Sequence, residues 1–142
     1  SCKAAAVLSD VPVEMAENAY SYGRHLGLAF QVVDDILDFT GSTEALGKPA
    51  CADLIGGNLT APVLFALEKE PLLEVLIERE FSNPGDLEQA IALIEASHGI
   101  ERARELAATQ AKLAMECLAD LPPSECRQAL ISMTDYVLSR LY

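Results

Sequence analysis

The stretch GLAFQVVDDILDFTG, residues 27–41, decides the fold and the chemistry that we expect of this chain. It is among the most apolar parts of the sequence, yet it carries three carboxylates, those of Asp34, Asp35 and Asp38. No Lys, Arg or His lies between His25 and Lys48, so no basic side chain close in sequence offsets these charges. Something else must make three carboxylates tolerable, or useful, in an apolar helix.

The spacing of the polar residues places four of them on one face of a helix: Gly27, Gln31, Asp34 and Asp38. The other positions are almost all apolar, which is typical of a central, buried helix. We therefore expect the polar stripe to face a cavity rather than bulk water. Repulsion between like charges one turn apart, burial, and the negative end of the helix dipole all disfavour carboxylates in that position.

A divalent cation would offset these costs. Asp oxygens one turn apart can reach a metal in front of the helix, and an oxygen-only set without His or Cys suits Mg²⁺ or Mn²⁺ rather than zinc. Mg²⁺ typically takes one or two protein carboxylates and fills its other positions with water and phosphate oxygens, which predicts a phosphate-bearing substrate. The alternative is a solvated helix end with ordinary surface Asp residues, which the flanking apolar residues disfavour.

The following segment, EALGKPACADL, places Lys48 in a loop rich in Gly and Pro just beyond the carboxylates. An ammonium there can contact the same phosphate as a point charge. The alternative is a solvated loop lysine. Asp53 can orient Lys48 or bind metal-bound water, or it can cap the turn that follows.

Ala, Leu and Glu dominate the sequence and a convincing period-2 alternation of apolar and polar residues is absent, which predicts an all-helical chain. Hydrophobic residues make up 51% of the 142 residues and the net charge is -12, which excludes general disorder and makes nucleic acid and anionic membranes poor partners. We expect no transmembrane segment, because no apolar run approaches the length of about 18 residues that one needs. Helices are predicted to end near Leu8 and then to span about 13–39, 60–69, 71–80, 84–97, 100–121 and 124–141.

We expect one all-helical domain over residues 1–142. Residues 40–52 are predicted to form a loop, with ADLIGG as a short turn-like piece after it. The first residues, SCKAAAVLSD, resemble the end of a helix already in progress, so we expect a fragment that lacks preceding helices.

These residues together resemble the trans-type polyprenyl diphosphate synthases. The family's F-Q-x-x-D-D-x-x-D pattern is matched at Phe30, Gln31, Asp34, Asp35 and Asp38. The glycine-lysine segment that follows it in the family is matched at Gly47, Lys48, Asp53, Gly57, Thr60 and Pro62. The resemblance covers nearly the whole chain, and GNLTAPVLFALE is most similar to the cyanobacterial and plant plastid branch, which includes solanesyl diphosphate synthase.

The resemblance implies an all-α fold, the C-terminal portion of an isoprenoid-synthase helical bundle. It implies a Mg²⁺- or Mn²⁺-dependent prenyltransferase that condenses isopentenyl diphosphate with an allylic prenyl diphosphate. It also implies a homodimer, or a heterodimer with a related synthase subunit. The expected compartment is intracellular: the plastid if the plant-branch resemblance holds, and otherwise the cytoplasm.

The resemblance also assigns roles to individual residues. Asp34, Asp35 and Asp38 would form one wall of a metal–diphosphate cage, with Asp34 and Asp38 as the strongest candidates for ligands because they share a face. Asp35 points about 100° away from that face and would act from outside the set of direct ligands. Lys48 would contact the allylic diphosphate, and Gln31 and Phe30 would line the cavity near the reacting carbons, which makes Lys48 and Gln31 the catalytic candidates.

Two other functions stay open. The first aspartate-rich motif and the Arg-rich diphosphate site of the family are absent from these 142 residues, so we expect negligible turnover by the chain alone. The chain is then either part of an enzyme or a truncated or regulatory subunit that partners a full-length synthase. A generic carboxylate-bundle metalloprotein is the third possibility.

Overall fold

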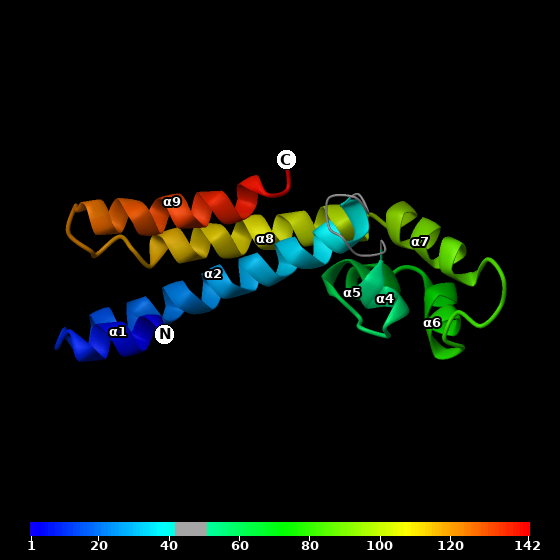
Figure 1. The fold of residues 1–142 in the computed structure, drawn as a ribbon, viewed down its shortest axis with the longest axis horizontal. Helices are drawn as coiled ribbons and strands as arrows, with labels where there is room; N and C mark the ends of the chain where they lie inside the picture. Colours follow the sequence, from blue (N-terminus) through cyan, green and yellow to red (C-terminus); the bar gives the residue numbers. More distant parts are fainter. Residues whose placement is uncertain (42–50) are drawn as a thin grey trace. The chain divides into compact units, whose positions relative to one another are not determined.

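In the computed structural model of the chain, residues 1–41 and 51–142 are described, and their regular elements are all helices (Figure 1). No β-strand occurs in these two ranges. The helices are α1 (Cys2–Leu8), α2 (Val13–Thr40), α4 (Ala52–Ile55), α5 (Ala61–Leu67), α6 (Pro71–Glu78), α7 (Asp86–Ala96), α8 (Gly99–Glu116) and α9 (Glu125–Ser139). The prediction of an all-α fold is therefore confirmed.

Proline and capping residues account for several helix starts. Pro71 and Pro62 lie in the first turns of α6 and α5, where a missing N–H costs no hydrogen bond. Ser124 precedes α9, and its hydroxyl accepts the backbone N–H of Arg127 at 3.1 Å. Each of these signals is visible in the sequence, and each predicted start lies within two residues of the observed one.

Helix α8 ends earlier than the sequence suggested. We expected it to reach Leu121, but it ends at Glu116 and continues as tight turns, in which the N–H of Ala119 donates to the carbonyl of Glu116 at 3.1 Å. Pro122 follows Leu121, and a proline disfavours helical geometry in the residue before it. The apolar spacing continues past the helix, which explains the overlong prediction.

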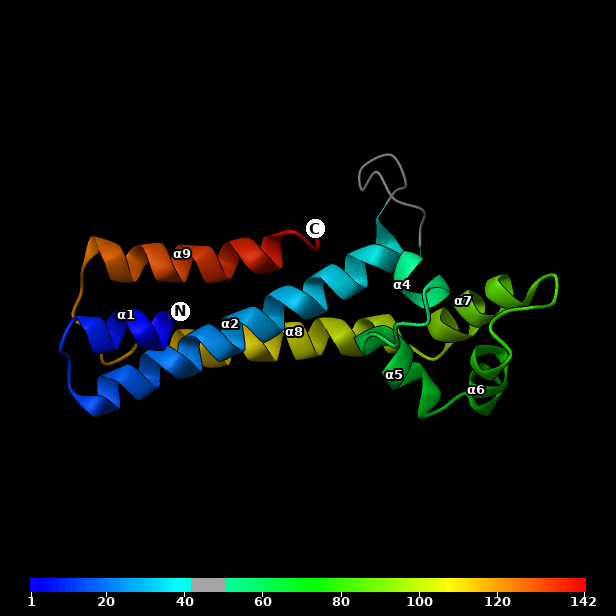
Figure 2. The ribbon, with the colours of Figure 1, turned by 60° about the horizontal axis from the view of Figure 1, so that its bottom comes forward.

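The chain forms two compact units, residues 1–33 with 106–142 and residues 34–105. The prediction of a single domain stays a prediction. In the first unit, α2 and α8 lie side by side (Figure 2). The core of this unit contains Tyr22, Ala114 and Leu118, and Cys2 and Leu130 pack against it from α1 and α9. Among the described residues, no helix combines the length and the apolarity needed to cross a membrane.

The second unit packs α4, α5, α6 and α7 around a separate core. Its fully buried side chains include Leu54, Val63, Leu73, Leu76 and Ile94. Gly99 permits a close approach of the two backbone segments, because a Cβ there would stand 2.4 Å from the carbonyl oxygen of Pro62.

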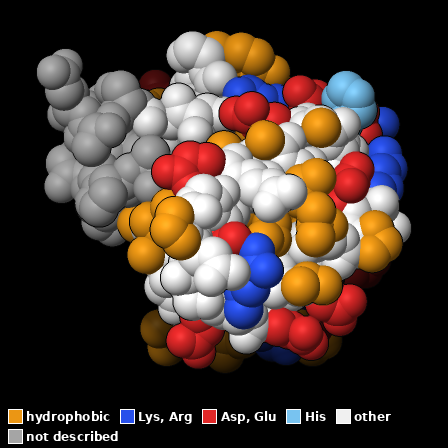
Figure 3. Space-filling view, turned by 90° about the vertical axis from the view of Figure 1, so that its right-hand side faces the viewer, with side chains coloured by type: hydrophobic (Ala, Val, Ile, Leu, Met, Phe, Trp, Pro, Cys, Tyr) orange, Lys and Arg blue, Asp and Glu red, His pale blue; other side chains and the backbone are white. Residues whose placement is uncertain are grey.

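Acidic side chains are scattered between hydrophobic ones on the face drawn in Figure 3, and basic side chains are fewer.

Candidate functional site

Helix α2 is buried on one side only. Ala29, Val33 and Ile36 are fully buried, whereas Gln31 is exposed and Phe30 keeps 45% of its surface accessible. The expectation of a helix buried on all sides was therefore wrong for the chain as described. Apolar residues occupy most of the helix surface, but the described residues of this chain bury only the face that contains Val33.

Asp38 is hydrogen-bonded to the chain segment that leads into α4. Its Oδ1 accepts the backbone N–H of Ala52 at 3.2 Å, and its Oδ2 accepts that of Asp53 at 3.1 Å. Its own carbonyl accepts the N–H of Cys51 at 2.9 Å. The side chain that the sequence marked as a metal ligand therefore also caps the start of a short helix.

Asp35 plays a similar part at α5. It is buried, with 7% of its surface exposed, and its Oδ2 accepts the N–H of Ala61 at 3.3 Å. Thr60 is the residue that precedes α5, but its hydroxyl makes no capping bond and is buried without a hydrogen-bond partner in the described structure. Asp35, and not the neighbouring Thr60, therefore satisfies the first N–H of α5.

Asp34 is half-buried and lies one turn before Asp38 on α2. Within residues 1–41 and 51–142, no group of three or more His, Cys, Asp or Glu side chains is close enough to hold a metal ion. A cation at Asp34 would thus have to take most of its ligands from water or from a bound anion. This is the coordination that Mg²⁺ commonly adopts with phosphate-bearing substrates.

Cys51 shows how tightly the start of α4 is held. Its backbone adopts a left-handed conformation, with φ of 58°, which is strained for a residue with a Cβ. Its thiol is buried, and burial, followed by the carboxylates of Asp38 and Glu95, raises its pKa. The thiol is therefore neutral at pH 7 and acts as a small apolar group.

Lys48, the predicted diphosphate contact, lies outside the described residues. Its predicted role stays a prediction, as do the roles of Gln31 and Phe30 in the cavity.

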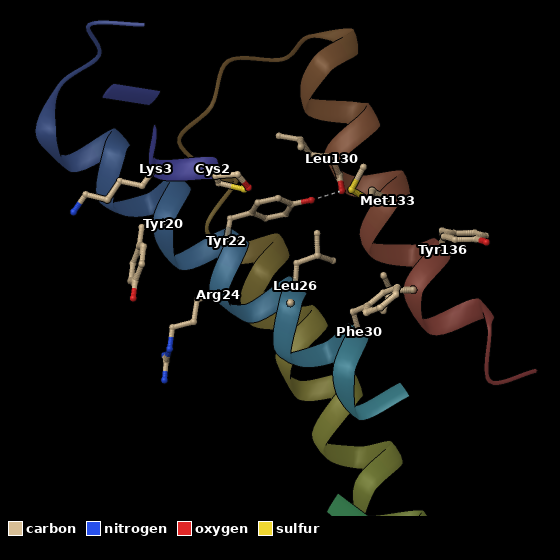
Figure 4. A pocket seen from close by; sticks show the side chains of 14 residues that line it. Cys2, Lys3, Tyr20, Tyr22, Arg24, Leu26, Phe30, Leu130, Met133 and Tyr136 are labelled. Carbon is tan, nitrogen blue, oxygen red and sulfur yellow. Dashed lines mark hydrogen bonds between the residues drawn. The ribbon is translucent and has the colours of Figure 1, made fainter. Parts of the chain in front are cut away.

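Phe30 borders a groove of about 920 Å³ in the first unit (Figure 4). Tyr22, Leu26 and Phe30 project from α2 toward Leu130 and Met133 of α9, and the Tyr22 hydroxyl donates to the carbonyl of Leu130 at 3.0 Å. The lining is largely apolar.

The guanidinium of Arg140 lies 4.8 Å from the centre of the Phe30 ring, a cation–π contact. Sequence analysis missed this contact, because the two residues stand near opposite ends of the chain and no local pattern links them. It also missed the capping by Asp35 and Asp38, because these residues precede the amides that they cap by 26 and 14 residues, too far for a local capping signal.

Comparison with known proteins decides the family. The sequence profile named polyprenyl synthetase matches residues 1–94. The chain belongs to the polyprenyl synthetase family. A relative from Synechocystis sp., named prenyl transferase, is 61% identical over 142 residues, which are 100% of this chain and 44% of the relative. Solanesyl diphosphate synthase 2, chloroplastic, from Arabidopsis thaliana is 54% identical and aligns with 99% of this chain and 34% of its own length.

Solved members of the family share the fold. The apo form of an Arabidopsis medium/long-chain length prenyl pyrophosphate synthase superposes with a TM-score of 0.88 at 43% identity, over 99% of this chain and 49% of that one. A polyprenyl synthase from Caulobacter crescentus, solved in complex with calcium and isoprenyl diphosphate, gives a TM-score of 0.84 at 36% identity, over 99% and 44% of the two chains. The chain thus spans less than half the length of these relatives. The predicted family and bundle fold are confirmed.

Proposed function

We propose that this chain supplies one carboxylate wall of a prenyltransferase that condenses isopentenyl diphosphate with an allylic prenyl diphosphate. The observation that carries the proposal is the end of α2, where Asp34, Asp35 and Asp38 stand within two turns and two of them are fixed by backbone N–H groups. These bonds hold the starts of α4 and α5 in place around the end of α2, so the backbone beside Asp34 is ordered before a charged ligand binds.

The proposed cofactor is Mg²⁺, or Mn²⁺ in its place. Carboxylate oxygens are the donors that these cations prefer, and Asp34 would be the carboxylate that meets the cation, with its neighbours Asp35 and Asp38 adding negative charge nearby. When bound, a divalent cation neutralises a diphosphate and stabilises it as a leaving group. The calcium and isoprenyl diphosphate bound to the Caulobacter relative support this class of ligand.

The other candidate residues have distinct tasks in the proposed reaction. Lys48 would neutralise charge on the allylic diphosphate as its C–O bond breaks, because an ammonium is a mobile point charge. Gln31 precedes Asp34 by one turn on α2 and would orient the reacting groups. Phe30 would shield the allylic cation from water, which would otherwise quench it.

The names of the relatives favour a compartment by analogy, whereas the partner is proposed from the family resemblance alone. Solanesyl diphosphate synthases 1 and 2 of Arabidopsis thaliana are named chloroplastic, and the Synechocystis relative is cyanobacterial. We therefore place the protein in a plastid or in a cyanobacterial cell, working as a homodimer or with a related synthase subunit.

A titration of the chain with Mg²⁺ tests the proposal. Isothermal calorimetry is run with Mg²⁺ alone, with inorganic diphosphate alone, and with both together. We expect measurable binding only when both are present, because each ligand completes the coordination of the other. The matched control is Asp34→Asn, which removes one charge and keeps the side-chain size. Equal binding by both proteins, or binding of Mg²⁺ alone, contradicts the proposal.

A second candidate function is that of a non-catalytic subunit that partners a full-length synthase. The exposed apolar side chains beside the groove favour it, since Met133 and Tyr136 keep 53% and 66% of their surfaces accessible. The test is co-purification with a full-length synthase, followed by turnover assays with and without this chain. A stable complex whose turnover does not change when Asp34→Asn is introduced favours the subunit over the enzyme.

A further inference from the structure

We propose that Asp38 is a positioning residue of the carboxylate site and not a ligand of its cation. Its carboxylate and its backbone carbonyl together fasten residues 51–53 to the C-terminal end of α2. The inference rests on the proposed function, because it divides the work among the carboxylates of that site: Asp34 meets the cation, and Asp38 holds the surrounding backbone.

The hydrogen bonds of Asp38 carry the first step. Three consecutive backbone N–H groups, those of Cys51, Ala52 and Asp53, donate to three different oxygens of this one residue, at 2.9, 3.2 and 3.1 Å. Both carboxylate oxygens are thus directed at the start of α4. A ligand of Mg²⁺ has to direct an oxygen at the metal with strict geometry, whereas these two bonds fix the direction of the Asp38 carboxylate by the backbone of α4.

The sequence around α4 explains why the anchor is needed. The first N–H groups of a helix have no partner within it, and they are usually satisfied by the side chain just before it. Cys51 occupies that position and makes no capping bond. Asp38, from the preceding helix, takes over the task.

The strain at Cys51 supports the same conclusion. A residue other than glycine persists in the left-handed conformation only where its surroundings hold it there. At Cys51, with φ of 58°, the surroundings include the bond from its N–H to the carbonyl of Asp38 and the bonds of the next two residues to the Asp38 carboxylate. Removal of this carboxylate should therefore leave the N–H groups of Ala52 and Asp53 without their acceptor, while the bond from the Cys51 N–H to the backbone carbonyl of Asp38 remains.

Hydrogen exchange measured by NMR on this chain tests the anchor without any turnover. In Asp38→Ala, we expect the amides of Ala52 and Asp53 to exchange about tenfold faster or more, because their acceptor is lost. In Asp38→Asn, one acceptor oxygen remains, and the acceleration should be only about threefold. The matched control is Asp53→Asn, which removes a neighbouring charge but no acceptor and should change exchange less than twofold. Unchanged exchange in Asp38→Ala overturns the proposal.

Binding of Mn²⁺ in the presence of inorganic diphosphate, followed by electron paramagnetic resonance, separates positioning from ligation. We expect Asp34→Asn to weaken Mn²⁺ binding tenfold or more, and Asp38→Asn to weaken it less than about threefold. Equal losses for the two variants overturn the positioning role. If Asp34→Asn changes nothing, the proposed function fails, while the exchange measurement still decides whether Asp38 anchors residues 51–53.

Discussion

The C-terminal end of helix α2 and the part around residues 20–30 differ in how far this chain provides contacts for their side chains. At the C-terminal end, the carboxylates of Asp35 and Asp38 receive backbone N–H groups from the starts of α5 and α4. Further toward the N-terminus, Tyr20, Leu28 and Phe30 keep between 39% and 52% of their surfaces accessible. The charged end is held by this chain, whereas the apolar part is left partly uncovered.

This difference shows that the carboxylates are hydrogen-bonded within this chain, whereas several apolar side chains are left partly uncovered by it. A buried carboxylate without a hydrogen bond is costly enough to destabilise the fold, so the chain satisfies it locally. An exposed apolar side chain lowers the stability of the fold far less. A group of such side chains commonly marks a surface that a ligand or another protein surface covers. The carboxylate end can therefore be studied in this chain, while the apolar part is studied best in a longer synthase.

The largest effect is expected at Asp34. In a full-length synthase that carries this chain, Asp34→Ala should lower kcat by about a hundredfold or more, because an interaction with the developing diphosphate charge is lost. Steady-state incorporation of labelled isopentenyl diphosphate measures it. Leu28→Ala, at a partly exposed apolar position with no assigned role in the reaction, is the comparison and should lower kcat far less. A loss below tenfold in Asp34→Ala would count against its role with the metal.

Truncation of a side chain should lower the free energy of unfolding more in the packed core of the second unit than beside the exposed groove of the first unit. Ile94 is fully buried in the second unit, so Ile94→Ala should lower the free energy of unfolding by about 2–5 kcal/mol. Met133 is 53% exposed beside the groove of the first unit, and Met133→Ala should cost less than about 1 kcal/mol. Urea denaturation followed by circular dichroism measures both. A larger loss in Met133→Ala would show that the groove is packed in solution.

A smaller, pH-dependent effect is expected at the turn between α6 and α7. Hydrogen bonding from the Arg79 guanidinium holds the pKa of Asp86 below its usual value of 3.8, and the N–H of Asn83 adds to this at 3.1 Å. The ion pair therefore stabilises the fold fully above about pH 4, and this contribution is lost as the pH falls through the lower pKa of the folded state.

The variant Asp86→Asn isolates this contribution. The difference in urea midpoint between the wild type and Asp86→Asn should be constant from pH 5 to pH 7 and should shrink as the pH falls below about 4. A difference that grows on acidification would contradict the assigned sign.

Much of the fold could be predicted from the sequence because its signals are local. Pro71 marks the start of α6, and Ser124 caps the start of α9. The helical spacing of apolar residues along α2 is a further signal that can be read within a few residues. The end of α8 was misplaced, because apolar spacing continues through residues 117–121 although the regular helix has already ended at Glu116.

The site was harder to predict than the fold. Spacing alone places Asp34 and Asp38 on one face of α2, but it does not reveal that the Asp38 oxygens accept the N–H groups of Ala52 and Asp53. The contact between Arg140 and Phe30 depends on the packing of α9 along α2, which no short motif encodes. Both features arise from tertiary contacts between distant parts of the sequence.

A transplant tests the central claim most directly. This chain replaces the matching 142 residues of the Synechocystis relative, with which it is 61% identical, and incorporation of labelled isopentenyl diphosphate into allylic primers is measured. We predict turnover within about tenfold of the parent enzyme, dependent on Mg²⁺ and lost in Asp34→Ala. A folded hybrid without turnover, or one whose turnover is unaffected by Asp34→Ala, would contradict the claim that this chain supplies a working carboxylate wall.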